Sequence, residues 1–189
     1  MTRINFRNPA YLARGNARQQ RAYRALQSLG IFRILRAYTP VLAGTIPLNI
    51  DIPGSDLDII CKACDLDAFA RAVTDAFGAH AGFRVKRKVI KGVESVIVNY
   101  DYGGFPIEIF GQPKPVTEQN AYRHLLVEAR LLKIGGESAR RAIRQLRRAG
   151  LKTEPAFARY FQLEGDPYEG LLRLGELSEE ELRKTIGHR

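Results

Sequence analysis

The stretch that decides the fold is residues 44–61, GTIPLNIDIPGSDLDIIC. Its central feature is a pair of aspartates, Asp56 and Asp58, which leads directly into a β-branched run. In a strand, residues i and i+2 point to the same face, so the two carboxylates would project side by side while Leu57 faces a core on the other side. Two like charges held this close repel one another unless a cation lies between them.

Two interpretations of the Asp56 and Asp58 pair are open. If the pair marks a polar strand start at the protein surface, both carboxylates are simply solvated. If it marks a divalent-cation site, the carboxylates are hard oxygen ligands, and Mg²⁺ is commonly held by such ligands together with substrate phosphates.

The neighbouring residues favour the cation site. Gly44 and Thr45 end a short apolar strand expected at 41–44, and they would open a turn that can approach a phosphate. Glu108 is the lone charge in a second short apolar strand, expected at 105–110. A carboxylate in such a strand is costly unless it is paired, hydrogen-bonded or bound to a metal. We therefore expect three acidic side chains to meet at one site.

This combination resembles the signature of the DNA polymerase beta-like nucleotidyltransferase superfamily, and it spans roughly residues 40–111. The residues that carry the resemblance are Gly44, Thr45, Asp56, Asp58 and Glu108. The chain departs from the pattern in having Thr45 where serine is commoner and Ser55 where a hydrophobic residue usually precedes the first aspartate. The series Gly-Thr-Ile-Pro and Pro-Gly-Ser-Asp-Leu-Asp is also similar to a small, uncharacterised bacterial nucleotidyltransferase-like family.

The resemblance implies Mg²⁺-dependent transfer of a nucleoside monophosphate from an NTP to an acceptor hydroxyl, with release of pyrophosphate. It implies a two-metal site whose catalytic and metal-binding residues are Asp56, Asp58 and Glu108. It also implies nucleotide binding by Gly44, Thr45 and Ser55. The NTP and the acceptor stay open, and RNA and a protein side chain are both candidates for the acceptor.

Two alternatives to an enzyme remain. One is a non-catalytic nucleotide- or RNA-binding module on a nucleotidyltransferase-like fold. The other is a basic RNA-associated protein in which the three carboxylates are structural. Asp101 competes with Glu108 for the third acidic position, but its place in an expected turn makes it the weaker candidate. Asp51 is expected to cap a turn.

The composition of the chain limits the class of protein to which it can belong. The 189 residues suit one domain, or a compact core with a helical appendage, and 45% hydrophobic with 26% charged residues is ordinary for a soluble globular protein. The 30 basic residues outnumber the 20 acidic ones and give a net charge of +10, which favours a polyanionic partner or substrate. No segment is apolar enough for a membrane span or a signal sequence, so we expect a cytoplasmic protein.

The positive charge is concentrated in two arginine clusters. Residues 1–50 contain no acidic residue and eight arginines: Arg3, Arg7, Arg14, Arg18, Arg21, Arg24, Arg33 and Arg36. The second cluster lies on one expected helix and contains Arg140, Arg141, Arg144, Arg147 and Arg148. Either cluster is a solvated helix face or a surface that steers phosphates or RNA toward the acidic site, and the second case predicts salt-dependent affinity.

The order of elements predicts an α+β fold, with a small mixed β-sheet flanked by helices and a helical C-terminal region. We expect an N-terminal arm at 1–15, a nucleotidyltransferase-like core at 16–115 and helices at 116–189. The expected strands are 41–44, 56–62, 83–89, 94–100 and 105–110. The expected helices are 16–29, 31–38, 65–77, 117–133, 137–149, 153–163 and 168–174, with a last one after Ser178.

Two further features have alternative interpretations. The basic strand at 83–89 is either an edge protected by charge or a surface that meets the triphosphate, and we favour the edge. Cys61 and Cys64 have the spacing of a redox motif or half a zinc site, but the chain has no second cysteine pair. We expect both to be reduced cytosolic thiols.

Overall fold

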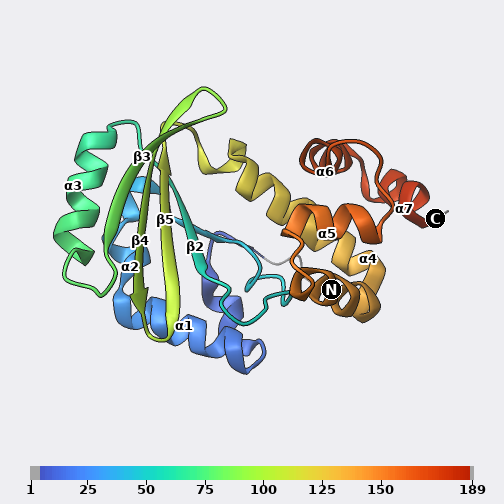
Figure 1. The fold of residues 1–189 in the computed structure, drawn as a ribbon, viewed down its shortest axis with the longest axis horizontal. Helices are drawn as coiled ribbons and strands as arrows, with labels where there is room; N and C mark the ends of the chain where they lie inside the picture. The colour runs from blue at the N-terminus through green and yellow to red at the C-terminus, as the bar shows by residue number, and fades with distance from the viewer. Residues whose placement is uncertain (1–4, 188–189) are drawn as a thin grey trace. The chain divides into compact units, whose positions relative to one another are not determined.

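The computed structural model of the protein describes residues 5–187, and in that range a five-stranded mixed sheet is flanked by helices (Figure 1). The predicted fold class is confirmed. The chain divides into two units: the first contains the described residues up to Pro47 and Gly54–Gln119, and the second contains Leu48–Pro53 and the residues from Asn120 onward. The sheet belongs to the first unit, and the second unit is helical.

The sheet has the strand order β1-β2-β5-β4-β3. Its strands are β1 (Val41–Ala43), β2 (Leu57–Lys62), β3 (Arg84–Ile90), β4 (Val93–Tyr102) and β5 (Phe105–Gln112). Strands β2 and β5 are parallel, and the other neighbours are antiparallel. The basic strand β3 lies at the edge of the sheet, as we predicted.

One face of the sheet is apolar and the other carries the acidic residues. Leu57 and Ile59 of β2 and Ile107 and Ile109 of β5 are buried in a single core. The residues between them on both strands point the opposite way, because side chains alternate across a strand. The burial pattern therefore assigns Asp58 and Glu108 to the second face.

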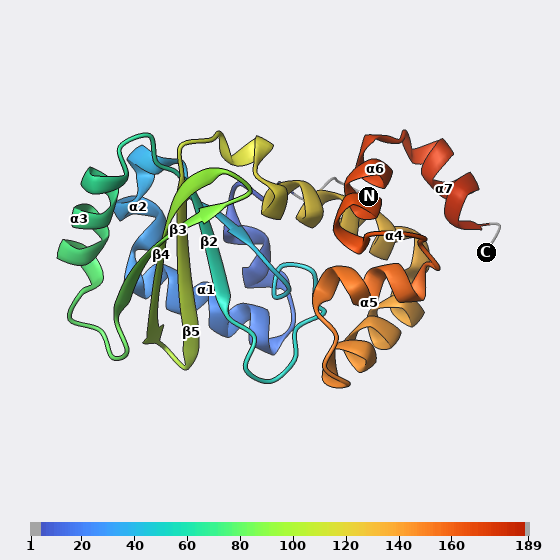
Figure 2. The ribbon, with the colours of Figure 1, turned by 45° about the horizontal axis from the view of Figure 1, so that its top comes forward.

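Three helices supply most of the remaining structure of the first unit: α1 (Ala17–Leu29), α2 (Ile31–Ile34) and α3 (Leu66–Phe77). Short 3-10 turns lie at η1 (Pro9–Arg14), η2 (Arg36–Tyr38) and η3 (Val116–Glu118). Apolar side chains of α1 and α3 join the core on the apolar face of the sheet, and both helices lie beside it in the two views of Figures 1 and 2.

The ends of α1 and α3 follow the expected local rules. Asn16 caps α1 by accepting a hydrogen bond from the Gln19 backbone N–H at 2.9 Å, and the Gln19 side chain accepts one from the Asn16 backbone N–H. Gly30 ends α1 in the left-handed conformation, with φ of 65°. Asp65 caps α3 in the same way as Asn16 caps α1, by accepting from the Ala68 N–H at 2.8 Å.

The segment expected to be a loose arm is packed onto the fold where the structure describes it. Leu12 is fully buried in the core beside α1, and Phe6 is also buried. The ring of Phe6 meets the ring of Tyr11 edge to face, with 5.5 Å between their centroids. These apolar side chains lack helical or strand periodicity, so the sequence did not indicate their burial. Arg3 lies outside the described residues.

The second unit contains α4 (Asn120–Arg148), α5 (Thr153–Tyr160), α6 (Pro167–Glu176) and α7 (Glu179–Gly187). Gly136, with φ of 62° and ψ of −152°, interrupts α4 where we predicted a helix break. Asp166 caps α6, and Ser178 and Glu181 form a capping box at the start of α7, the last helix that we predicted. Helix α4 begins at Asn120, three residues later than predicted, because residues 116–118 form the turn η3.

Part of the second arginine cluster has a structural role inside this unit. Arg144 donates to the backbone carbonyl of Asn49 at 3.0 Å, and Arg147 donates to that of Ile50 at 2.9 Å. These bonds tie the segment Leu48–Pro53 to α4. Other members, such as Arg141, are exposed. The sequence could not separate the two groups, because they alternate along one helix.

Glu128 is an acidic residue buried inside the helical unit, with 4% of its surface exposed. Burial raises its pKa well above the usual value, the nearby Glu154 raises it further, and Arg147 acts in the opposite direction. The folded protein therefore holds this proton more tightly than the unfolded chain. The contribution of the Glu128 carboxyl to the free energy of unfolding is therefore complete below the pKa of the unfolded chain, about 4.3. It is lost as the pH rises through the higher pKa of the folded protein.

We expect Glu128→Gln to increase the free energy of unfolding at pH 7 by about 1 kcal/mol, the usual scale of a single substitution. The gain should shrink as the pH falls toward 4.5, because the unfolded chain then also begins to bind this proton and the penalty for protonating Glu128 on folding becomes smaller. Glu154→Gln is the control of opposite sign: burial raises the pKa of Glu154, but the hydrogen bond and charge of His124, a backbone hydrogen bond and the charge of Lys152 together outweigh burial and hold the pKa low. Urea unfolding between pH 4.5 and 8 measures both variants, and a loss of stability in Glu128→Gln at every pH contradicts the prediction.

No helix within residues 5–187 is both long and apolar enough to cross a bilayer. The cytoplasmic location stays a prediction. Cys61 is buried at the end of β2, and burial raises the pKa of its thiol, whereas Cys64 is exposed.

Candidate active site

The two carboxylates that the sequence analysis placed on different strands lie opposite each other in the sheet. Asp58 of β2 and Glu108 of β5 are direct register partners in the parallel pair. Both side chains are partly exposed, and both point to the face opposite the core. The sheet thus brings Asp58 and Glu108 together from positions separated by a helix and two strands.

Asp56 lies two residues before Asp58, just outside β2. Its charge acts on Glu108: burial raises the pKa of Glu108 above the usual value, and the charge of Asp56 raises it further. A hydrogen bond from Asn99 and the positive charge of Lys88 act in the opposite direction. A cation placed among these acids would relieve their mutual repulsion.

Asn99 was not predicted as a site residue. It lies on β4 directly opposite Glu108, and its Nδ2 donates to Glu108 Oε2 at 3.3 Å. The signal for it was the period-2 alternation of β4. Asn99 stands in the sequence between Val98 and Tyr100, which are buried on the apolar face, so Asn99 points to the other face, where the carboxylates lie. The sequence did not give the strand order needed to use that signal.

Gly44 has a steric reason to be glycine. Its φ is +77°, and a Cβ built on it would lie 2.0 Å from Asp58 Oδ2. The absence of a side chain therefore lets the end of β1 lie directly against the Asp58 carboxylate. The next residue, Thr45, is 93% removed from solvent, with 7% exposed. β1 thus ends right beside the Asp58 carboxylate, and phosphate binding at this turn stays a prediction.

Ser55, just before Asp56, is held by a residue that we had grouped with the N-terminal arginine cluster. Arg18 of α1 donates from Nη2 to the Ser55 backbone carbonyl at 3.1 Å. The guanidinium of Arg18 also lies over the ring of Phe105, 5.2 Å from its centroid. Arg18 therefore positions the loop that leads into the acidic strand.

The edge strand β3 presents cations on the same face as the acids. Arg84 is the register partner of Asn99, and Lys86 and Lys88 follow it at two-residue intervals. Arg87 points the opposite way and forms an ion pair with Asp67 of α3. Because side chains alternate along β3, Arg84, Lys86 and Lys88 form a basic border beside the carboxylate face. The same strand is the charged edge of the sheet that we expected.

A metal site is not complete in the side chains alone. Within residues 5–187, no three His, Cys, Asp or Glu side chains gather closely enough to hold a metal ion by themselves. The donor set nevertheless fits Mg²⁺, which is usually bound by one or two carboxylates together with substrate phosphates and waters. Asp58 offers a carboxylate of this kind beside the Gly44 backbone.

Comparisons with known proteins give one family match and several similar solved structures. The family model "Domain of unknown function (DUF4269)" matches residues 24–174. No curated protein sequence matches the chain. Among solved structures, the Cid1 poly(U) polymerase with MgGTP bound is similar over 82% of this chain, with 15% identity and a TM-score of 0.51. A second structure of Cid1 poly(U) polymerase is similar over 88% of this chain, with 13% identity and a TM-score of 0.51.

These similarities show a nucleotidyltransferase fold. The chain spans 48% of the first Cid1 structure and 52% of the second. The sequence prediction of a polymerase beta-like fold is therefore confirmed at the level of architecture. The roles of Asp56, Asp58, Glu108, Gly44, Thr45 and Ser55 stay predictions.

Proposed function

The chain belongs to the DUF4269 family, and we propose that it is a Mg²⁺-dependent nucleotidyltransferase that transfers a nucleoside monophosphate from an NTP to an acceptor hydroxyl. The observation that carries the proposal is the opposition of Asp58 and Glu108 on one face of the sheet, with Asp56 acting on the same site. The nucleotidyltransferase fold supports it. A binding surface alone gains nothing from acids that repel one another, as Asp56 and Glu108 do.

Asp56, Asp58 and Glu108 are the residues that would hold the metal. Bound Mg²⁺ supplies charge neutralisation for the triphosphate and for the oxygen that attacks it, and Glu108 is the residue that we assign to a second ion. Asn99 donates to Glu108 Oε2 and so restricts the orientation of that carboxylate. Arg18 restricts the loop before Asp56 in the same sense.

We assign phosphate binding to Gly44, Thr45 and Ser55. The backbone at Gly44 lies against Asp58, and Thr45 and Ser55 each carry a hydroxyl that could contact a phosphate. Phosphoryl transfer depends on positioning and on stabilising charge, so no histidine or cysteine nucleophile is required. These residues would orient the triphosphate relative to the acids and exclude water from it.

The test is calorimetric titration of ATP, GTP, CTP and UTP, each with and without Mg²⁺. We expect one NTP to bind in the presence of Mg²⁺ and its affinity to fall at least about tenfold in Asp56→Ala/Asp58→Ala, since each lost charge contact is worth about 1.5–3 kcal/mol. Asp75→Ala, at an exposed position of α3, is the matched control for loss of a carboxylate.

Two outcomes would contradict the proposal. One is that no NTP binds under any condition. The other is binding that is indifferent to Mg²⁺ and to both aspartates, which would favour a non-catalytic nucleotide-binding module. A thermal melt of each variant shows whether a loss of binding reflects a loss of folding.

A further inference from the structure

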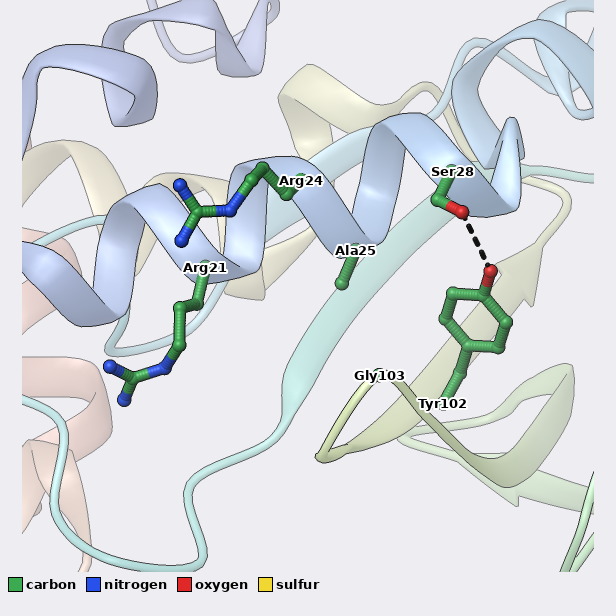
Figure 3. A pocket seen from close by; sticks show the side chains of 6 residues that line it. All are labelled: Arg21, Arg24, Ala25, Ser28, Tyr102 and Gly103. Carbon is green, nitrogen blue, oxygen red and sulfur yellow. Dashed lines mark hydrogen bonds between the residues drawn. The ribbon is translucent and has the colours of Figure 1, made fainter.

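A second candidate site lies on the first unit, formed by one face of α1 and the turn that follows β4. It is an open pocket of about 370 Å³ lined by Arg21, Arg24, Ala25, Ser28, Tyr102 and Gly103. The four α1 residues are spaced i, i+3, i+4 and i+7, which is one face of a helix. Figure 3 shows both guanidinium groups on one side of the view and the Tyr102 ring on the other, with Ala25 and Gly103 between them.

Arg21 and Arg24 are exposed and have no hydrogen bond or ion pair with any described residue. Helix α1 has no acidic residue, and neither does the sequence before it. Asp101, the nearest acid along β4, points to the opposite face of that strand from Tyr102. Two neighbouring cations that no carboxylate neutralises attract an anionic ligand.

Contacts within the first unit fix the positions of Gly103 and Tyr102 in the pocket. Gly103 has φ of +59°, and a Cβ built on it would lie 3.0 Å from the Ala25 Cβ, so glycine lets the turn approach the helix. The Tyr102 hydroxyl and the Ser28 hydroxyl are 3.0 Å apart and share a hydrogen bond. His80 contacts the Tyr102 ring edge to face, with centroids 5.1 Å apart. The aromatic ring is therefore held in place beside the two arginines.

The chemistry of the pocket selects its occupant. Guanidinium groups bind phosphates, and an aromatic ring beside them offers a surface on which a base stacks, which is the combination used for single-stranded nucleic acid. A membrane surface would also need exposed apolar side chains, and the large apolar residues that are exposed within residues 5–187 are on α2 and β3 and do not line this pocket. An open pocket suits a single nucleic-acid strand that passes through it.

We propose that this pocket binds a segment of single-stranded nucleic acid, with Arg21 and Arg24 on successive phosphates and Tyr102 against a base. The inference goes beyond the proposed nucleotidyl transfer, since it concerns a separate set of residues and needs neither NTP nor metal. Its failure and the failure of the transferase proposal are therefore separate results.

The experiment is fluorescence anisotropy with labelled single-stranded RNA and DNA oligonucleotides on the full chain, without NTP or Mg²⁺. We expect Arg21→Gln/Arg24→Gln to weaken binding about tenfold at low salt and to reduce the slope of log K against log salt by about 1.4, or about 0.7 for each lost phosphate contact. Tyr102→Leu should weaken binding about fivefold or more, and Tyr102→Phe should lose less affinity than Tyr102→Leu, since it keeps the ring and loses only the hydrogen bond to Ser28.

The matched control removes the same charge elsewhere. Arg141→Gln/Arg148→Gln changes two exposed arginines of α4 and should leave the salt slope nearly unchanged. The proposal is overturned if this control loses as much affinity as the pocket variant, or if the pocket variant binds like the wild type. It is also overturned if vesicles of anionic lipid, or inorganic phosphate at matched ionic strength, compete with the oligonucleotide for the pocket.

Discussion

Asp58→Asn is expected to abolish nucleotidyl transfer while the protein stays folded. Asn has nearly the same shape as Asp but is a neutral and much weaker ligand for Mg²⁺. If the carboxylate contributes about 4 kcal/mol of charge stabilisation in the transition state, the rate falls about 1000-fold. We expect a larger loss here than at Asp56, because Asp58 lies against the Gly44 backbone and is the register partner of Glu108.

The measurement is pyrophosphate release from the NTP that binds in the calorimetric test, with RNA oligonucleotides and proteins supplied as acceptors. Asp75→Asn on the exposed side of α3 is the control for the same chemical change, and it should retain full activity. Far-UV circular dichroism and a thermal melt show whether Asp58→Asn is folded. If folded Asp58→Asn retains turnover, then Asp58 is not the metal ligand, and the enzymatic proposal in this form is wrong.

The sequence predicted the acidic strand and its neighbours because their signals are local. Alternation over residues 56–62 places Asp58 and Leu57 on opposite faces, and that alternation depends only on the strand itself. The helix cap at Asn16 and the break at Gly136 are local in the same way, and the structure has both. Elements of this kind can be read from a single chain.

What the sequence did not predict depends on contacts between distant residues. Asn99 became relevant only when the strand order placed β4 next to β5. Arg18 and Arg21 belong to the same arginine-rich helix, yet one holds the Ser55 loop and the other lines a pocket. A charge pattern cannot distinguish these roles, because they are decided by what each side chain meets after folding.

Burial in the N-terminal segment was missed for a related reason. Leu12 and Phe6 follow no regular period, so they gave no signal for packing. Their burial is a consequence of the space that α1 leaves beside the core. Tertiary context, and not local propensity, decides the conformation of such segments.

Gly111→Ala is expected to cost the first unit about 2–3 kcal/mol of stability, the upper part of the usual range for overpacking a core. Gly111 lies on β5 beneath α3, and a Cβ there would lie 2.2 Å from Phe69 Cε1 and 2.5 Å from Phe69 Cδ1. Phe69 is fully buried, so its ring cannot move out of the way into solvent. The added methyl group must push α3 away from the sheet or force Phe69 from its rotamer.

A double-mutant cycle separates this clash from any other effect of the substitution. Phe69→Leu alone removes ring atoms and should cost about 1–2 kcal/mol, yet Gly111→Ala/Phe69→Leu should cost less than the sum of the two single changes. Gly170→Ala is the control, because its nearest neighbour would be 3.8 Å from the added Cβ and α6 gains a better helix former. Urea unfolding measures the wild type and the four variants. Additive costs in the cycle would mean that Phe69 is not the obstacle, and that β5 tolerates only glycine at this position for a reason in its own backbone.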